Sequence, residues 1–226
     1  MTKLERYKDQ LEFVRKNEQG YDEYRNKKDG YLLVHIPAIT ATIGTDLTDG
    51  GVQDEGPQHQ VELEDYFIGV HPITVAQYRR FVEETGYHVS EFCAGLLKNM
   101  DMQDHPITYV SIPDSVAYLV WAGLRLPTEV EWEHAYRGPN NNVFPWGNEW
   151  DSTKCHNSVD SEKTGTAAIG SYPSGVSHYG AHDMAGNVWE WTSTEFKSYP
   201  YSPTDGREDY IRDLMEATAS VPFEVL

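Results

Sequence analysis

A short stretch near the C-terminal end of the chain, GAHDMAGNVWEW, combines residue types that can do chemistry. It places the carboxylates of Asp183 and Glu190 seven residues apart, and it sets Glu190 between Trp189 and Trp191. Either the segment is an aromatic anchor strand whose glutamate faces water, or a cation meets the carboxylate, because burying an unpaired charge is costly. In an extended segment the two indoles share one face, so we expect both to be buried core anchors.

Histidines and cysteines elsewhere are weaker candidates. His178, His182 and Asp183 form the pattern H-x-x-x-H-D, which could bind a metal. Gly180 lies between the two histidines, however, and we interpret them as surface or loop histidines. His134 lies within a capped helical pattern and is expected to be a satisfied helical histidine. Cys93, in the apolar run EFCAGLL, is interpreted as a small buried side chain, and Cys155 is a poor partner for a hard cation. No Ser-His-Asp order, phosphate-binding loop or GxGxxG motif is present.

The charge distribution limits the partners. The 226 residues carry a net charge of -18, with 36 acidic and 18 basic side chains. The first 30 residues hold eight bases and seven acids, so the remainder carries 10 bases against 29 acids. Such a surface repels phosphate backbones and anionic lipid, so we expect no nucleic-acid or membrane partner. No apolar run is long enough to span a bilayer, and two cysteines are too few for a disulfide framework, so we expect a cytoplasmic protein.

The elements that must position these residues follow from periodicity. Residues 1–28 are predicted to be helical, since Leu4, Tyr7, Leu11 and Val14 recur at helical spacing, and residues 27–30 are predicted to form a linker. The stretches YLLVHIPAITATIG and VELEDYFIGVH predict strands. Three helices are predicted by N-cap residues and a closing glycine, namely Thr74 to Gly86, Ser111 to Gly123 and Thr128 to Gly138.

Residues 139–203 have almost no helical periodicity. Asn, Gly, Pro and Ser punctuate short aromatic stretches that we interpret as strands. Helices followed by irregular β structure predict an α+β domain whose sites lie in long loops. The last residues, with Ile211, Leu214, Met215 and Thr218 at helical spacing, predict one or two amphipathic turns.

Six stretches, DEGPQHQVEL, ITVAQYRRFVEETGY, HPITYVSIPDSVAYLVWAG, RLPTEVEWEHAYRG, FPWGNEW and YGAHDMAGNVWEWTS, occur in the order seen in the formylglycine-generating enzyme (sulfatase-modifying factor) family. The chain therefore resembles that family over roughly residues 31–207. The resemblance implies an α+β, C-type-lectin-like fold with low regular secondary structure and long loops. The family includes copper-dependent oxidases that convert a sulfatase cysteine to formylglycine, domains of ergothioneine-type sulfoxide synthases, and variable proteins of diversity-generating retroelements that only bind ligands.

The resemblance also implies calcium. Matched position by position, Asp183 and Glu190 would give side-chain oxygens, and Gly186 and Val188 backbone carbonyls, to one ion. Calcium takes six to eight oxygens of this mixed kind. A second family site matches Asn157 and the carbonyl of Ser158, but no acid aligns cleanly with the next ligand position, and Asp160 could take it only by a shift.

The family oxidases carry a cysteine pair in a C-terminal segment that begins with a GGSW-like motif, and the pair binds Cu(I). This sequence has no such segment, and neither Cys93 nor Cys155 matches it, so copper is not supported. The segment supplies core strands in relatives, so the domain resembles one truncated at the C-terminus. A shortened reading frame, a split gene or a substituting tail would each explain this difference.

These observations predict three regions: a helical N-terminal extension (1–30), a formylglycine-generating-enzyme-like domain (31–210) and a divergent tail (211–226). The favoured function is a non-catalytic, calcium-stabilised, lectin-like scaffold that presents loops to a protein or small ligand. The alternative is a formylglycine-generating-type oxidase whose catalytic cysteine segment is missing from this chain. A third hypothesis is a remnant that does not fold stably.

Overall fold

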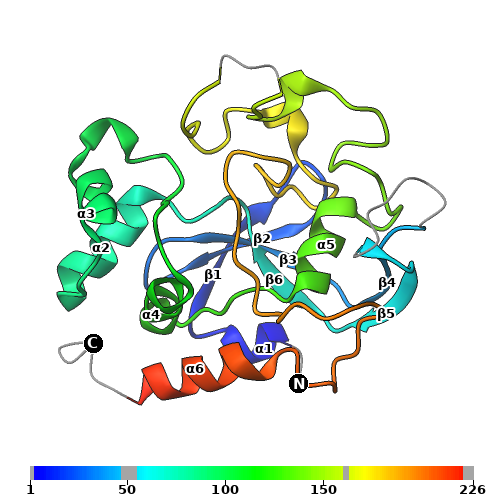
Figure 1. Ribbon diagram of the computed structural model, residues 1–226, viewed down its shortest axis with the longest axis horizontal. Coiled ribbons are helices and arrows are strands. Elements are labelled where there is room, and N and C mark those ends of the chain that lie inside the picture. The colour runs from blue at the N-terminus through cyan, green and yellow to red at the C-terminus, as the bar shows by residue number, and fades with distance from the viewer. Residues whose placement is uncertain (1–2, 47–54, 160–162, 221–226) are drawn as a thin grey trace.

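The computed structural model describes residues 3–46, 55–159 and 163–220. These residues form six α-helices and six strands, and four of the strands make up a small central sheet (Figure 1). The strands are β1 (Leu11–Lys16), β2 (Asp22–Asn26), β3 (Leu32–Ile36), β4 (Ile39–Ile43), β5 (His59–Leu63) and β6 (Tyr66–Gly69). The helices are α1 (Lys3–Tyr7), α2 (Val75–Thr85), α3 (Glu91–Lys98), α4 (Ile112–Ala122), α5 (Glu129–Arg137) and α6 (Asp209–Ala219). The expected α+β class is confirmed.

The central sheet has the order β1-β2-β3-β6, and all its neighbouring strands are antiparallel. β4 and β5 form a separate two-stranded ribbon. In Figure 1 α2 and α3 lie on one side of the sheet, α5 and the β4-β5 ribbon lie on the other side, and α6 crosses below. The predicted strands in YLLVHIPAITATIG and VELEDYFIGVH are thus present, as β3 with β4 and as β5 with β6.

The prediction that residues 1–28 form a helix is wrong. Of the described part, residues 3–28, only α1 is helical, and β1 and β2 form a hairpin that pairs with β3. Leu11 is buried but Val14 is 37% exposed, so the apparent helical face is not a single buried face. Glu23, on β2, is buried and pairs with Arg15 at 2.7 Å. Pairing with β3 overrides the local helical pattern, since propensity is a weak determinant against tertiary contacts.

The segment predicted as a linker, residues 27–30, is the tight turn between β2 and β3. Its flanking backbone groups are paired, because the N–H of Asn26 donates to the carbonyl of Tyr31 at 2.8 Å. Asp29 is buried and accepts hydrogen bonds from the Tyr31 N–H and, at 2.6 Å, from the Tyr118 hydroxyl on α4. The turn therefore ties the N-terminal hairpin to the helical layer and does not separate two domains.

The three capped helices are confirmed. Thr74, Ser111 and Thr128 each form a capping box with the residue three positions later. α2 and α4 end at glycines in the left-handed conformation, and α5 ends at Gly138, whose φ is also positive. The apolar faces of α2 and α4 form one core with α3 and α6, while the sheet, α5 and the β4-β5 ribbon enclose a second core.

The long segment after α5 is irregular, as expected, but the short strands predicted in it are absent from its described residues. Between residues 139 and 203 these contain only two 3₁₀ turns, Ser152–Lys154 and Pro173–Gly175, and one isolated bridge pair, Phe144 with Gly147. Side chains take the place of a strand ladder here, because groups such as Asn187 bond the backbone of neighbouring loops.

The C-terminal residues form a longer helix than predicted. α6 has 11 residues and packs on α4, with Ile211 buried. Just before it, the Arg207 side chain is almost fully buried, pairs with Asp205 at 2.7 Å and lies over the ring of Tyr201. Glu208 accepts hydrogen bonds from nearby hydroxyls, which fixes the start of the helix. None of the helices in the described ranges is long and apolar enough to cross a membrane.

Candidate functional site

The loop of residues 183–190 is held in a conformation that its sequence makes possible. Asp183 and Asn187 have positive φ angles of 59° and 65°, a region that Asp and Asn tolerate better than most residues. Gly186 has a φ of 132°, and a Cβ there would lie 2.4 Å from the backbone carbonyl oxygen of His156. Asn187 bonds both the N–H and the carbonyl of Ala167. The loop thus packs directly on His156 and Ala167.

The residues expected to bind calcium lie in this loop. Oδ2 of Asp183 accepts a hydrogen bond from the Gly170 N–H at 3.3 Å. The Gly186 carbonyl accepts from the Val188 N–H at 2.8 Å, which leaves it a second lone pair. Among the described residues no group of three or more His, Cys, Asp or Glu side chains could hold a metal. Any ion bound here must therefore use main-chain oxygens as well.

Glu190 is in an unusual electrostatic position. Glu190 lines the pocket and is exposed to solvent there, although many protein atoms surround its carboxylate. Desolvation by these atoms, together with the negative charge of Asp183, raises the pKa of Glu190 to about 7. The indole N–H of Trp132 acts in the opposite direction and lowers the pKa of Glu190. This N–H is itself buried and has no partner within hydrogen-bond distance. Within the described ranges no cation pairs with either carboxylate.

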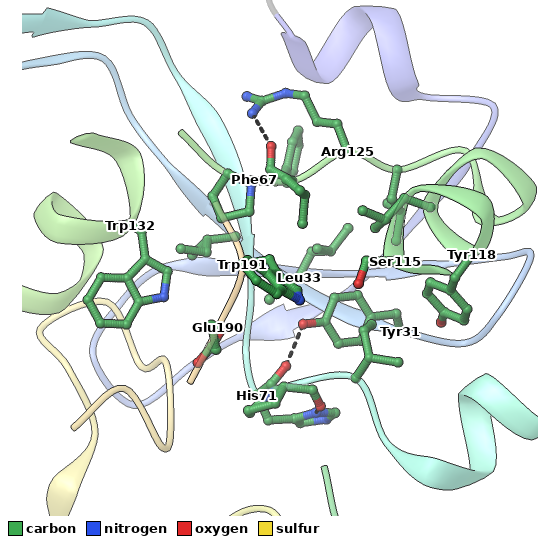
Figure 2. A pocket seen from close by; sticks show the side chains of 18 of the residues that line it. Tyr31, Leu33, Phe67, His71, Ser115, Tyr118, Arg125, Trp132, Glu190 and Trp191 are labelled. Atoms are coloured by element: carbon green, nitrogen blue, oxygen red, sulfur yellow. Dashed lines mark hydrogen bonds between the residues drawn. The ribbon is translucent and has the colours of Figure 1, made fainter. Parts of the chain in front are cut away.

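The pocket has a volume of about 420 Å³, within the range of small-molecule sites. It lies between the face of β3 and β6, helix α4 and the extended residues 188–191, which run across the sheet between α4 and α5 in Figure 1. Figure 2 shows Glu190 and Trp132 on one side of the cavity and Ser115 and Tyr118 on the other. Apolar side chains such as Leu33 form most of its wall.

The polar groups around the pocket are mostly satisfied within the protein. The Tyr31 hydroxyl donates to the carbonyl of His71. Arg125 donates to both carboxylate oxygens of Glu131, at 2.7 and 2.6 Å, so its charge is already compensated. Glu190 therefore carries the uncompensated charge among the described acidic and basic residues that line this pocket.

The prediction that Trp189 and Trp191 are buried core anchors is wrong. Trp189 is 102% exposed and Trp191 is 49% exposed. The segment is not a strand, and both indoles lie along the pocket, where the Trp191 N–H donates to the carbonyl of Val110 at 3.1 Å. A fully exposed indole beside an apolar cavity is available for contact with another molecule.

The two cysteines lie in different parts of the molecule and form no disulfide. Cys93 is buried on α3 in the helical core, where burial and the nearby charge of Asp114 raise its pKa to about 11. Cys155 is buried beneath the 183–190 loop, and its sulfur accepts a hydrogen bond from Asn157. Neither thiol lines the pocket. The expectation that Cys93 is a small buried side chain is confirmed.

His134 is a satisfied helical histidine, as expected. It is 1% exposed and shares a 2.6 Å hydrogen bond with the Tyr179 hydroxyl. His178 is exposed and bonds the hydroxyl of Tyr21 at 2.9 Å. His182 also lies in a loop, as expected, but it is half-buried in the pocket wall and its Nδ1 has no partner.

We expect His134 to make the fold acid-sensitive. Burial, and then the neighbouring His178, lowers its pKa from 6.5 to about 4. The folded state therefore prefers the neutral imidazole. The contribution of His134 to the free energy of unfolding is fully present above pH 6.5 and is lost as the pH falls from 6.5 towards 4. The loss reaches up to about 3 kcal/mol. Urea unfolding at a series of pH values measures it. His134→Gln should flatten the profile and the exposed His88→Gln should not, whereas a His134→Gln profile as steep as wild type would contradict the assignment.

Comparison with known proteins identifies the family. The model of the sulfatase-modifying factor enzyme 1-like domain matches residues 22–219. The chain belongs to this family. The matched range begins within the N-terminal hairpin and includes α6. The recognition made from the six sequence stretches is thereby confirmed.

The curated relatives differ in activity. The chain is 33% identical to a hercynine oxygenase of Mycolicibacterium smegmatis, over 85% of this chain and 52% of the relative. It is 29% identical to the formylglycine-generating enzyme of Mus musculus, over 78% of this chain and 63% of the enzyme. It is 27% identical to the inactive C-alpha-formylglycine-generating enzyme 2 of Mus musculus, over 73% of this chain and 69% of that protein. The chain thus spans between half and two-thirds of the first two relatives.

Solved structures support the fold. PvdO from Pseudomonas aeruginosa superposes with a TM-score of 0.64 at 26% identity, over 76% of this chain and 74% of PvdO. Treponema denticola variable protein 1 superposes with a TM-score of 0.62 at 17% identity, over 84% of this chain and 78% of the variable protein. This likeness concerns the fold alone. The expected formylglycine-generating-enzyme type of α+β fold is confirmed.

Proposed function

We propose that this chain is a non-catalytic member of the family, a calcium-stabilised scaffold that binds a protein or small ligand. One observation carries the proposal. The pocket bordered by Trp189 and Trp191 contains no thiol, and the two cysteines of this chain are buried elsewhere. Formylglycine formation by the copper route needs two thiolates on one soft cation. A relative named as inactive supports the possibility of such a member.

Calcium fits the donor set of the 183–190 loop. The negative charge of Asp183 raises the pKa of Glu190, and no cation of the described residues compensates the two carboxylates. Calcium prefers carboxylates together with carbonyl oxygens, and the carbonyls of Gly186 and Val188 belong to the same turn. The ion would supply the missing positive charge and hold the loop in place.

The pocket supports ligand binding. Its size, its apolar wall and the exposed Trp189 at its edge are the features of a site for a small molecule or an inserted side chain. The negative charge of the chain disfavours nucleic acid and anionic membrane as partners. The alternative, an oxidase whose cysteine segment is missing from this chain, draws support from the catalytic relatives.

Binding of a neutral apolar dye, Nile red, tests the pocket. We expect Trp189→Ala to remain folded, with a melting temperature within about 2 °C of wild type, because the indole is fully exposed. The same variant should weaken dye binding about three- to tenfold through loss of the aromatic contact.

Trp150→Ala is the matched control, because Trp150 is a half-exposed indole that lies outside the pocket. Fluorescence titration measures the affinities. Equal dye affinity in wild type and Trp189→Ala, or an unfolded Trp189→Ala variant, would contradict this assignment.

A further inference from the structure

A lysine ammonium links two stretches that precede the candidate calcium site, residues 152–159 and residues 163–172. Nζ of Lys163 donates to the backbone carbonyl oxygens of Ser152 at 3.2 Å and Cys155 at 3.0 Å. The ring of Tyr172 lies 5.0 Å from the same nitrogen. Two main-chain carbonyls and one aromatic face thus surround a single positive charge, which is the environment that a bound cation prefers.

Asn157 points its amide nitrogen to the same two carbonyls. Its Nδ2 lies 3.4 Å from the Ser152 oxygen and 3.3 Å from the Cys155 oxygen. Its Oδ1 accepts the backbone N–H of Val159 at 3.0 Å, and this bond fixes the orientation of the amide, since a backbone N–H can only donate. The amide nitrogen, and not the side-chain oxygen, therefore faces the carbonyls of Ser152 and Cys155.

These groups do not fit the metal that the family resemblance implies for Asn157 and Ser158. Calcium requires six to eight converging oxygens. In this loop the converging carbonyls face N–H donors from Asn157 and Lys163, and an ammonium beside them repels a divalent cation. Asp160, which could have supplied a carboxylate, lies outside the described residues.

We propose that Lys163 is a built-in cation that takes the place of a metal ion between residues 152–159 and residues 163–172. These two stretches are then held together with or without calcium, and no calcium binds at Asn157 and Ser158. This inference goes beyond the proposed function, because it concerns a different loop and does not depend on an ion at Glu190.

The position matters for the neighbouring site. The carbonyl oxygen of His156, next to Asn157 in this loop, accepts the backbone N–H of Asn187 at 2.9 Å and lies against Gly186. A loop fixed by its own lysine therefore provides a permanent support for residues 183–190. In the proposed arrangement, calcium would stabilise only the loop of residues 183–190.

Substitution of Lys163 by methionine tests the closure. Lys163→Met keeps the length of the side chain but removes the charge and the donors. We expect the melting temperature to fall by about 3–6 °C, by the same amount in excess calcium and in chelator. Lys98→Met, at an exposed position near the end of α3, is the matched control and should change it by about 1 °C or less. An unchanged melting temperature in Lys163→Met would overturn the proposal.

Calorimetric titration with calcium tests whether the ion binds at Asn157 and Ser158. We expect wild type to bind at most one calcium and Glu190→Gln to bind none. One calcium bound by Glu190→Gln and lost on further substitution Asn157→Ala would overturn the proposal, as would two ions on wild type. If Glu190 binds no calcium, wild type shows no binding at all, which contradicts the proposed calcium role of Glu190 and upholds the role of Lys163.

Discussion

Replacement of Gly186 by alanine is expected to cost about 3–5 kcal/mol of stability. Two terms contribute. A φ of 132° is accessible to glycine but strained for a residue with a Cβ, and the new methyl group would lie 2.4 Å from the carbonyl oxygen of His156. That oxygen belongs to the backbone and also accepts a hydrogen bond from Asn187, so it cannot move away cheaply. Urea unfolding of both proteins measures the loss.

Gly147→Ala provides a matched control. Gly147 has a φ of 135°, almost the same as Gly186, but no heavy atom lies within 4 Å of the position that a Cβ would take there. It therefore carries the backbone strain alone, about 1–3 kcal/mol. The difference between the two variants measures the contact between His156 and the 183–190 loop. Equal losses would contradict the close packing of these loops.

Removal of the Glu190 carboxylate is expected to abolish stabilisation by calcium. An ion that binds only the folded state adds about 2.7 kcal/mol at a hundredfold excess over Kd. For a chain of this size that is a rise of about 5–10 °C in melting temperature. Glu190→Gln should melt at the same temperature in calcium and in chelator, and Asp183→Asn should behave in the same way.

The exposed Glu216→Gln, on α6, is the control and should keep the full calcium response. Thermal melts in chelator and in a calcium series measure the effect. A wild-type melting curve that chelation leaves unmoved would show that the proposed calcium site does not bind the ion.

Much of the fold could be predicted from the sequence where local signals and tertiary structure agree. Thr74, Ser111 and Thr128 each indicate a helix through a capping box, and such boxes depend only on residues within one turn. The first 28 residues could not be predicted in this way, because their strands depend on pairing with β3. The helical spacing of Leu11 and Val14 is a local coincidence that a long-range contact overrides.

The candidate site could be predicted in part. The sequence indicates the loop around Asp183 and Glu190, and in the folded chain the negative charge of Asp183 raises the pKa of Glu190. The spacing of Trp189 and Trp191 predicts core positions, because aromatic side chains are usually buried. In the structure both indoles are exposed, because they lie along a cavity at the face of the sheet. Nothing in the spacing of Lys163 indicates that its ammonium meets two carbonyls, since these come from a 3₁₀ turn eight to eleven residues away.

The non-catalytic role is tested most directly by mass spectrometry of a cysteine-containing sulfatase peptide incubated with the protein, copper and a reductant. Oxidation to formylglycine lowers the peptide mass by about 18 Da through the change in covalent chemistry. We expect no such product, because Cys93 and Cys155 are both buried, lie in different parts of the molecule and do not border the pocket. A product that forms with wild type and disappears in Cys93→Ser or Cys155→Ser would contradict the account.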